Sequence, residues 1–250
     1  MVANLLFFED DIFIIDKVWL EEFAEKFRKQ VNIPFICYGR ANIIDEESVK
    51  LLKKAGCVIL RMAIEAGNDE IRNTLLKRKM SREMILKASE QLHENGIKLS
   101  VSNMIGLPTE TIESVKETLQ LNIDCKADNP TAQYFMPYPK MELTRIAIEK
   151  GYFDETHFDD IHKNTWKFTP LHFENKTQVY FKKIQKLFTL FVLFPHLRRF
   201  EKLFFLLPTF ILYIISVVVR IWVTKNYLPK TNVSIAQRLR FLIRFIQYYG

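Results

Sequence analysis

The chain has 250 residues, of which 48% are hydrophobic and 26% charged, and its formal net charge is +7 at pH 7. This length suits one sizeable domain with an appendage. Its three cysteines, Cys37, Cys57 and Cys125, are too far apart in sequence for a zinc or metal-cluster motif and too few for a disulfide framework. We therefore expect no metal ligand among them and a reducing, cytoplasmic location.

The charge is divided unevenly along the chain. Residues 180–250 hold 12 Lys or Arg and one acidic residue, Glu201, whereas residues 1–179 hold 24 basic and 28 acidic side chains. A slightly acidic globular domain is thus joined to a basic, aromatic-rich tail. Such a tail is typical of contact with a membrane surface or with nucleic acid. Its long apolar runs favour the membrane, and we expect no nucleic-acid partner.

Apolar runs and helical apolar repeats alternate along the first 155 residues. The expected strands cover residues 1–8, 34–38, 57–64, 97–105 and 131–136. The expected helices cover residues 16–30, 45–55, 69–76, 81–95, 111–123 and 141–150, and the expected N-caps are Asp16, Asp45, Ser81 and Thr109 or Thr111. This alternation implies a parallel sheet. Five units are too few for a closed eight-fold barrel. We therefore expect an α/β fold, a partial TIM-type (β/α) barrel, lacking its first strand because the sequence enters a strand almost at once.

The stretch Cys57–Asn68 is the centre of this pattern. It reads CVILRMAIEAGN, a mostly apolar run that predicts a buried strand ending at Glu65, with Gly67 allowing a tight exit. Ligands of α/β sheets bind at the carboxyl ends of the strands. Glu65 is therefore placed to accept hydrogen bonds from a ligand's hydroxyl or ammonium groups. The alternative is a capping or salt-bridging surface glutamate.

The other expected strands also end in polar or glycine residues. These are Glu9, Asp10 and Asp11 after the first strand, Gly39 and Arg40 after the second, Gly106 to Glu110 after the fourth, and Tyr134 to Pro139 after the fifth. Carboxyl ends of parallel strands meet at one edge of a sheet, so this set offers carboxylates, a guanidinium and a close backbone approach. It suits a zwitterionic, nucleoside-like ligand. The sequence has no Walker or dinucleotide glycine fingerprint, so phosphate recognition is not favoured there.

An irregular connection is expected over residues 156–179, between the barrel and the tail. It contains His157, Asp159, Asp160, His162 and His172. A cluster of His and Asp can bind a metal ion. The spacing matches no ligand pattern, however, which favours a solvated loop over a metal site.

Residues 180–250 are expected to form a helical, hydrophobic and basic C-terminal region. Residues 203–219 carry no charge, which reaches the lower limit of length for a membrane-spanning helix, and basic and aromatic residues flank them. Residues 235–249 predict an amphipathic helix with three arginines, suited to an anionic membrane surface. The alternative is a helical subdomain whose apolar faces pack on each other. Attachment to the inner face of the membrane is the prediction that follows from the first interpretation.

Five segments, in this order along the chain, resemble the radical S-adenosylmethionine (SAM) enzymes. They read FFEDDIFIID, CYGRANIIDEESVKLLKKAGC, LRMAIEAGNDEI, NGIKLSVSNMIGLPTET and FMPYPKMEL. The group that they resemble is the cobalamin-binding class that includes anaerobic magnesium-protoporphyrin IX monomethyl ester cyclase. The resemblance covers residues 1–155.

What this resemblance implies is a partial (β/α)₆ barrel in which a [4Fe–4S] cluster reduces SAM to a 5′-deoxyadenosyl radical. Glu65 is similar to the family's SAM-contacting acid, and the turn at Ile105 is similar to one that packs near adenine. The candidate cofactor-binding residues are Glu65, Arg40, Gly67, Ile105, Gly106, Tyr134 and Met136, and the substrate-side candidates are Glu9, Asp10 and Asp11.

The sequence departs from the family at the cluster. Family members hold the cluster with three cysteines in a CxxxCxxC loop after the first strand, and this sequence has neither that loop nor a cobalamin-binding domain. We therefore expect the C-terminal part of a radical SAM enzyme, inactive alone. An N-terminal half or partner chain would supply the cluster, and a parent or partner chain the cobalamin. The expected reaction is radical-initiated methyl transfer, cyclisation or a similar change in an apolar, small-molecule or lipid-like substrate.

Two other interpretations stay open. The first is a non-catalytic scaffold or membrane-associated partner protein derived from such an enzyme. The second is a cluster-free barrel enzyme such as an aldolase or isomerase, which needs a base at a strand end. No lysine lies at the expected strand ends, which disfavours this interpretation.

Overall fold

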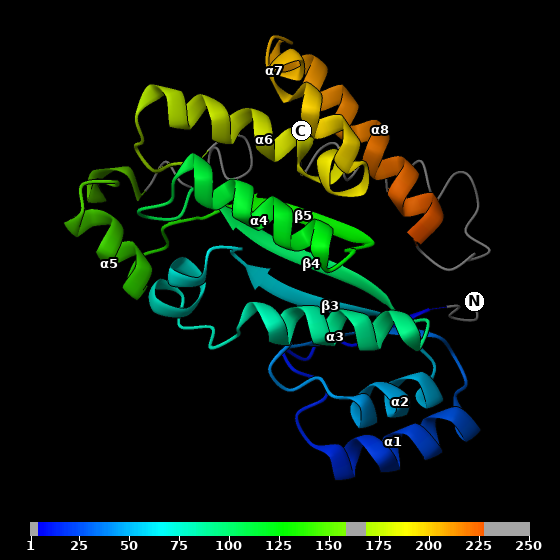
Figure 1. The fold of residues 1–250 in the computed structure, drawn as a ribbon. Coiled ribbons are helices and arrows are strands. Elements are labelled where there is room, and N and C mark those ends of the chain that lie inside the picture. Colours follow the sequence, from blue (N-terminus) through cyan, green and yellow to red (C-terminus); the bar gives the residue numbers. More distant parts are fainter. Residues whose placement is uncertain (1–4, 159–168, 228–250) are drawn as a thin grey trace.

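Five parallel strands form the sheet of the protein, whose computed structural model describes residues 5–158 and 169–227 (Figure 1). The strands are β1 (Leu6–Phe7), β2 (Phe35–Gly39), β3 (Cys57–Glu65), β4 (Lys98–Ile105) and β5 (Asn129–Tyr134). They lie side by side in chain order, and each neighbouring pair is parallel. The predicted α/β half-barrel is confirmed.

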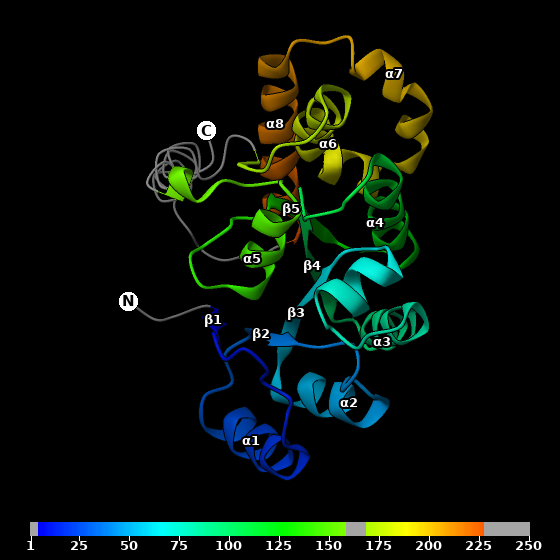
Figure 2. The ribbon, with the colours of Figure 1, turned by 90° about the vertical axis from the view of Figure 1, so that its left-hand side faces the viewer.

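Four helices follow the first four strands and cover one face of the sheet (Figure 2). They are α1 (Lys17–Gln30), α2 (Glu46–Ala55), α3 (Arg82–Glu94) and α4 (Ile112–Asp124). Each begins at a residue predicted as an N-cap, whose side chain accepts a hydrogen bond from the backbone N–H three positions later. The capping residues are Asp16, Asp45, Ser81 and Thr111.

A cluster of phenylalanines fixes the N-terminal side of the sheet. The rings belong to Phe8 and Phe13 between β1 and α1, Phe23 and Phe27 of α1, and Phe35 of β2, with neighbouring centroids 4.8–5.9 Å apart. Buried aromatic pairs of this kind add to the stabilisation from their apolar area. Packing of these rings, rather than strand length, therefore anchors the two-residue strand β1.

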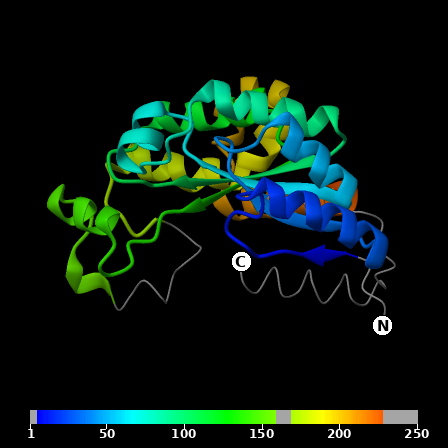
Figure 3. The ribbon, with the colours of Figure 1, turned by 90° about the horizontal axis from the view of Figure 1, so that it is seen from below.

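A smaller apolar cluster lies beyond the carboxyl ends of β4 and β5. Helix α5 (Glu142–Glu149) contributes to it and stands to one side of the sheet (Figure 3). The buried members are Ala66, Ile71, Leu107, Phe135, Ala147, Phe153 and Leu171. This apolar cluster therefore covers the carboxyl ends of β4 and β5.

The C-terminal region is helical and packs on the sheet. It comprises α6 (Asn175–Leu193), a 3₁₀ turn (Pro195–Phe200), α7 (Glu201–Phe204) and α8 (Thr209–Tyr227). The buried face of α6 belongs to the main core. Near the end of α8, Val223 and Tyr227 pack with Ile36 and Ile59 of β2 and β3.

Side chains of α6 bind the outer edge of β5. Gln185 Nε2 donates a hydrogen bond to the carbonyl of Ala132 (3.1 Å), and Thr189 Oγ1 donates one to the carbonyl of Pro130 (2.9 Å). An edge strand otherwise leaves such carbonyls unpaired. Helix α6 therefore takes the place that another strand would occupy.

Some predicted elements differ from those in the structure. The predicted helix over 69–76 is a short π-helix, Ile71–Leu75, and the helix of the C-terminal region begins at Asn175. The uncharged stretch 203–219 is not one helix, because α7 ends at Phe204 and α8 starts after Pro208, which has no backbone N–H to continue a helix. The predicted helix over 235–249 lies outside the described residues.

Helix α8 is the one described helix that is long and apolar enough to cross a membrane. Its mean hydropathy reaches 1.4 over an 18-residue window, of which 17% is buried in the protein. Length and composition alone give this result, so the prediction of a membrane span or of membrane attachment remains a prediction.

Candidate functional site

Glu65 occupies a strained position at the end of β3. The register between β3 and β4 shifts between Ala63 and Glu65, and the φ angle of Glu65 is 69°, in the left-handed region that non-glycine residues rarely adopt. Its carboxylate is largely buried, and burial raises its pKa, while the nearby guanidinium of Arg78 lowers it. The closest nitrogen of Arg78 lies 3.9 Å from the carboxylate. Backbone strain at a site of this kind is a sign of function.

The guanidinium of Arg78 lies near this carboxylate, and that of Arg40 lies near Arg78. Arg40 follows β2 and donates to the carbonyl of Arg78 (2.7 Å), and Arg78 donates to the carbonyl of Ala63 (3.0 Å). Nε of Arg40 and Nε of Arg78 are buried and have no hydrogen-bond partner among the described residues. Buried donors normally have partners. The exits of β2 and β3 thus bring a carboxylate together with two guanidinium groups whose buried Nε atoms have no partner among the described residues.

Arg72 holds the connection that follows Glu65 by hydrogen bonds to its backbone. Its side chain is fully buried and donates to the carbonyls of Met80 (2.8 Å), Ala66 (2.9 Å) and Gly67 (2.9 Å). It also pairs with Asp69. These bonds hold the connection after Glu65 in place, and sequence reasoning missed them because an arginine in a charged helical stretch usually faces solvent.

Gly67 is explained by packing on α4. A Cβ at this position would lie 2.4 Å from backbone atoms of Glu117 and Thr118, and the amide of Gly67 donates to Thr118 Oγ1 (2.8 Å). Only glycine permits so close an approach. The absence of a side chain at Gly67 therefore lets the residues after β3 pack directly on α4.

The exit of β4 is a turn held by Glu110. Ile105 is fully buried, and Gly106 has a φ angle of 79°. Glu110 Oε2 accepts hydrogen bonds from the amides of Gly106 (2.6 Å) and Leu107 (3.2 Å), while Oε1 is buried without a partner among the described residues. Burial raises the pKa of Glu110 to about 8, against the opposing effect of the two amides.

The remaining predicted residues lie at other places on the sheet. Tyr134 at the end of β5 is buried beneath α6, where its hydroxyl donates to the carbonyl of Phe181 (3.4 Å). Met136 packs into the apolar cluster beyond β5. The substrate-side candidates after β1 are exposed; they are Glu9, Asp10 and Asp11. The structure therefore gathers Glu65, Arg40 and Arg78, and places the residues after β1 and β5 on either side of them.

The cysteines do not fit an iron–sulfur cluster. The Sγ atoms of Cys37 and Cys57 are 3.8 Å apart inside the core, and Cys125 is buried at the end of α4. Burial raises the pKa of the Cys125 thiol to about 12, which opposes thiolate formation. Within residues 5–158 and 169–227, no group of three His, Cys, Asp or Glu side chains is arranged to hold a metal ion.

Residues 8–121 match the family model of the radical SAM superfamily. Among curated proteins, an uncharacterized methyltransferase of Pyrococcus horikoshii is 25% identical over 142 residues. Anaerobic magnesium-protoporphyrin IX monomethyl ester cyclase of Rubrivivax gelatinosus is 26% identical over 106 residues. These matches take in 56% and 42% of this chain but only 31% and 19% of the two proteins. The chain thus spans less than a third of these relatives.

A solved radical SAM enzyme shows the same fold, and a second solved structure matches part of the chain. Coproporphyrinogen III oxidase of Escherichia coli, a radical SAM enzyme, matches 80% of this chain and 40% of its own, with a TM-score of 0.55 and 14% identity. The radical SAM methyltransferase TsrM of Kitasatospora setae, solved with cobalamin and a [4Fe–4S] cluster, matches 52% of this chain and 27% of its own, with a TM-score of 0.46 and 21% identity. Residues 8–121 thus match the radical SAM superfamily, in agreement with the five sequence segments and with the half-barrel fold.

Proposed function

We propose that the exits of β2 and β3 bind SAM. The observation that supports this proposal is the largely buried carboxylate of Glu65 near Arg78, together with the buried Nε donors of Arg40 and Arg78, which have no partner among the described residues. SAM carries a carboxylate that can accept from guanidinium groups, and an ammonium and ribose hydroxyls that can donate to Glu65. When bound, SAM would supply a methyl group or a 5′-deoxyadenosyl radical.

Calorimetric titration of the full chain with SAM tests this proposal. We expect saturable binding that Glu65→Gln weakens by about tenfold or more, because a charge-assisted hydrogen bond contributes roughly 1.5–3 kcal/mol. The matched control is Glu70→Gln, an exposed glutamate on the same connection, which should bind as the unchanged protein does. Equal affinities of the two variants, or no saturable binding, would rule out this site.

We further propose that the chain is the C-terminal part of a radical SAM enzyme and is inactive alone. Its cysteines are buried in separate elements, and its relatives extend well beyond the part that it matches. The cluster ligands would then come from outside these 250 residues, and so would any cobalamin. Anaerobic reconstitution with iron and sulfide is expected to leave no cluster on the chain by itself. A stoichiometric [4Fe–4S] spectrum from this chain alone would contradict the proposal.

The proposed reaction is a radical-initiated methyl transfer or cyclisation of an apolar substrate. The relatives that support it are a methyltransferase and a cyclase. The alternative is a non-catalytic scaffold that keeps the half-barrel. Titration of this chain with SAM, in the presence of a second chain that carries a cluster on a CxxxCxxC loop, distinguishes the enzyme from the scaffold. Binding favours the enzyme, and failure to bind under that condition favours the scaffold.

We also propose that α8 contacts the inner face of the membrane, in a cytoplasmic protein. One side of α8 exposes Phe210, Ile214, Val218 and Trp222, and α7 and its flanks add Phe200, Leu203 and Leu206. Basic residues flank this surface, which suits a helix lying at an anionic interface. Flotation with phosphatidylglycerol vesicles should recover the protein. The double variant Ile214→Glu/Val218→Glu should remain at the bottom, and Val18→Glu, at an exposed valine of α1, should still float.

A further inference from the structure

Side chains of β3 alternate between the two faces of the sheet. Met62 and Ile64 belong to the main core, together with the buried faces of α1–α4. Arg61 and Ala63 lie on the opposite side, which we call the inner face, and both are partly exposed. The end of α8 packs on this inner face at Ile59, the residue that precedes Arg61 on the same side of the strand. Arg61 therefore lies next to the part of the inner face that α8 covers, and Ala63 lies beyond it.

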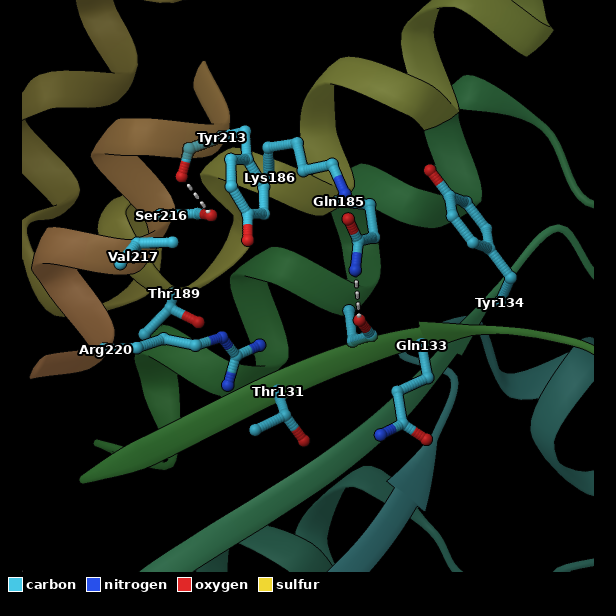
Figure 4. Close-up of a pocket in the computed structure, with 11 residues that line it drawn as sticks. Thr131, Gln133, Tyr134, Gln185, Lys186, Thr189, Tyr213, Ser216, Val217 and Arg220 are labelled. Atoms are coloured by element: carbon cyan, nitrogen blue, oxygen red, sulfur yellow. Dashed lines mark hydrogen bonds between the residues drawn. The ribbon is translucent and has the colours of Figure 1, made fainter. Parts of the chain in front are cut away.

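Small side chains continue the inner face across β4 and β5. Ser102 of β4 is the neighbour of Ala63 in register and is exposed, and Thr131 of β5 is the neighbour of Ser102. Figure 4 shows that Thr131 projects from β5 on the side opposite to Tyr134, which is buried beneath α6. Small residues at these neighbouring positions let the body of a ligand lie close to the sheet, between Arg61 and the strand exits.

Aromatic side chains, rather than an acid, hold the guanidinium of Arg61. Its Nη1 donates a hydrogen bond to the hydroxyl of Tyr38 (2.7 Å). Its Cζ lies 5.3 Å from the ring centroid of Tyr38 and 5.5 Å from that of Phe7, and such contacts attract a cation to the ring. No carboxylate of the described residues pairs with Arg61, whereas the surface residues Arg82 and Arg145 each pair with one. Arg61 is therefore a positive charge held in place without a counter-ion in the described part of the chain.

We propose that Arg61 binds a carboxylate of the substrate on the inner face, and that the substrate is an apolar carboxylic acid. A planar guanidinium can donate to both oxygens of a carboxylate and so orients the ligand as well as binding it. The rise along β3 from Arg61 to Glu65 is about 13 Å, at roughly 3.3 Å per residue. A substrate held at Arg61 therefore extends over Ala63 and Ser102 toward the strand exits, and its reacting carbon lies within about that distance of its carboxylate. The identity of this ligand as the substrate rests on the proposed function, whereas carboxylate binding at Arg61 does not require SAM.

Equilibrium dialysis of the full chain against pyrenebutyrate, a flat apolar carboxylate, tests the site. We expect saturable binding, and pyrenebutanol should bind about tenfold or more weakly, because it has no charge to pair with a guanidinium. Arg61→Gln should lower the affinity for pyrenebutyrate to that for pyrenebutanol. Arg61→Lys should keep part of the preference, because it retains the charge but loses the planar donor pair. Arg28→Gln, at an exposed arginine of α1, is the matched control and should bind as the unchanged protein does.

Three results would overturn the carboxylate site. They are no saturable binding of pyrenebutyrate, equal affinities for pyrenebutyrate and pyrenebutanol, and an undiminished preference for the carboxylate in Arg61→Gln. If Arg61→Gln does not fold, an undiminished preference in Arg61→Lys would overturn the site in the same way.

Calorimetric titration with SAM keeps this test separate from that of the strand exits. Arg61→Gln should retain the SAM affinity of the unchanged protein, and a tenfold loss would place Arg61 in the SAM site instead. An Arg61-dependent preference for the carboxylate in a chain that does not bind SAM would support the carboxylate site and reject the proposed function.

Discussion

The exits of β3 and β4 both present a glutamate, but the two carboxyl groups lie in opposite environments. Glu65 faces Arg78 across 3.9 Å at a corner with two unpartnered buried donors. Glu110 is fully enclosed and binds two backbone amides of its own turn. In the proposal made above, the carboxylate of Glu65 binds a ligand, whereas that of Glu110 accepts from the backbone next to it. Glu65 is the last residue of β3, whereas Glu110 lies in the connection between β4 and α4, so the two carboxyl groups meet different surroundings.

The strongest test of this comparison removes the support of the β3 exit. Arg72→Met should lower the free energy of unfolding by about 3–5 kcal/mol, because the buried carbonyls of Ala66, Gly67 and Met80 lose their donor. Urea denaturation measures the change. Arg145→Met removes an exposed arginine paired with Glu149 and should stay within about 0.5 kcal/mol. A similar small change for Arg72→Met would mean that this corner does not depend on it.

The free energy of unfolding should depend on pH through the buried carboxyl group of Glu110. A carboxyl group ionises near 4.5 in the unfolded chain, while the pKa of Glu110 is raised to about 8 in the native protein. Between these values the native state retains a proton that the unfolded state has released. The free energy of unfolding should therefore fall as pH rises from 4.5 to about 8, by up to roughly 1.4 kcal/mol per pH unit, and then level off.

Glu110→Gln should remove this contribution, because a neutral amide oxygen can still accept from Gly106 and Leu107 without titrating. The measurement is urea denaturation at pH values from 5 to 9. Glu113→Gln, at an exposed glutamate in the first turn of α4, should keep the slope of the unchanged protein. An identical slope in Glu110→Gln would show that its carboxyl group is already ionised at neutral pH.

A smaller loss of stability is expected from a side chain added at Gly67, after β3. In Gly67→Ala the new Cβ meets backbone atoms of α4 at 2.4 Å, so the strand exit must move away from the helix. Overpacking of this kind costs about 1–3 kcal/mol. Gly151→Ala meets no atom within 4 Å and bears only the strain of its φ angle of 74°, so it should lose less stability in the same thermal melt. The reverse order would contradict the close packing at Gly67.

The smallest expected change is a gain in the free energy of unfolding rather than a loss. Glu65→Gly should raise the free energy of unfolding by up to about 1 kcal/mol, because glycine adopts a φ angle of 69° without strain. The same change should abolish SAM binding. Asn32→Gly, where the φ angle is 49°, should change stability less, since asparagine tolerates this region. A loss of stability in Glu65→Gly would mean that its side chain stabilises the fold.

Local signals were enough to predict most of the half-barrel. Asp16, Asp45, Ser81 and Thr111 are N-caps because each polar side chain precedes a helical apolar repeat, and this pattern is visible within one turn. The strand exits at Arg40 and Glu65 follow in the same way from strand length. Pro208 within the uncharged stretch was also visible, and more weight on it would have predicted the break between α7 and α8.

The residues that sequence reasoning missed owe their roles to tertiary burial. Arg78 lies in a run of charges whose neighbours, Lys77 and Lys79, are exposed, so nothing in the sequence separates it from them. Glu110 resembles an ordinary acid at a helix start. In the fold, however, it is only 3% exposed and accepts from the amides of its own turn. The sequence places Glu110 among the polar residues after the fourth strand, and its burial is the feature that the sequence does not show.

The hydrogen bonds from α6 to β5 make the two edges of this sheet different for the pairing of a further strand. With the carbonyls of Pro130 and Ala132 already engaged, no incoming strand finds acceptors on that margin. Within the described residues β1 is bonded to β2 alone. A donated strand, from another segment or another chain, must therefore arrive alongside Leu6 and Phe7, a few residues from the three carboxylates that follow them. Within the described residues, the margin of β1 is the one whose backbone groups are left for a further strand.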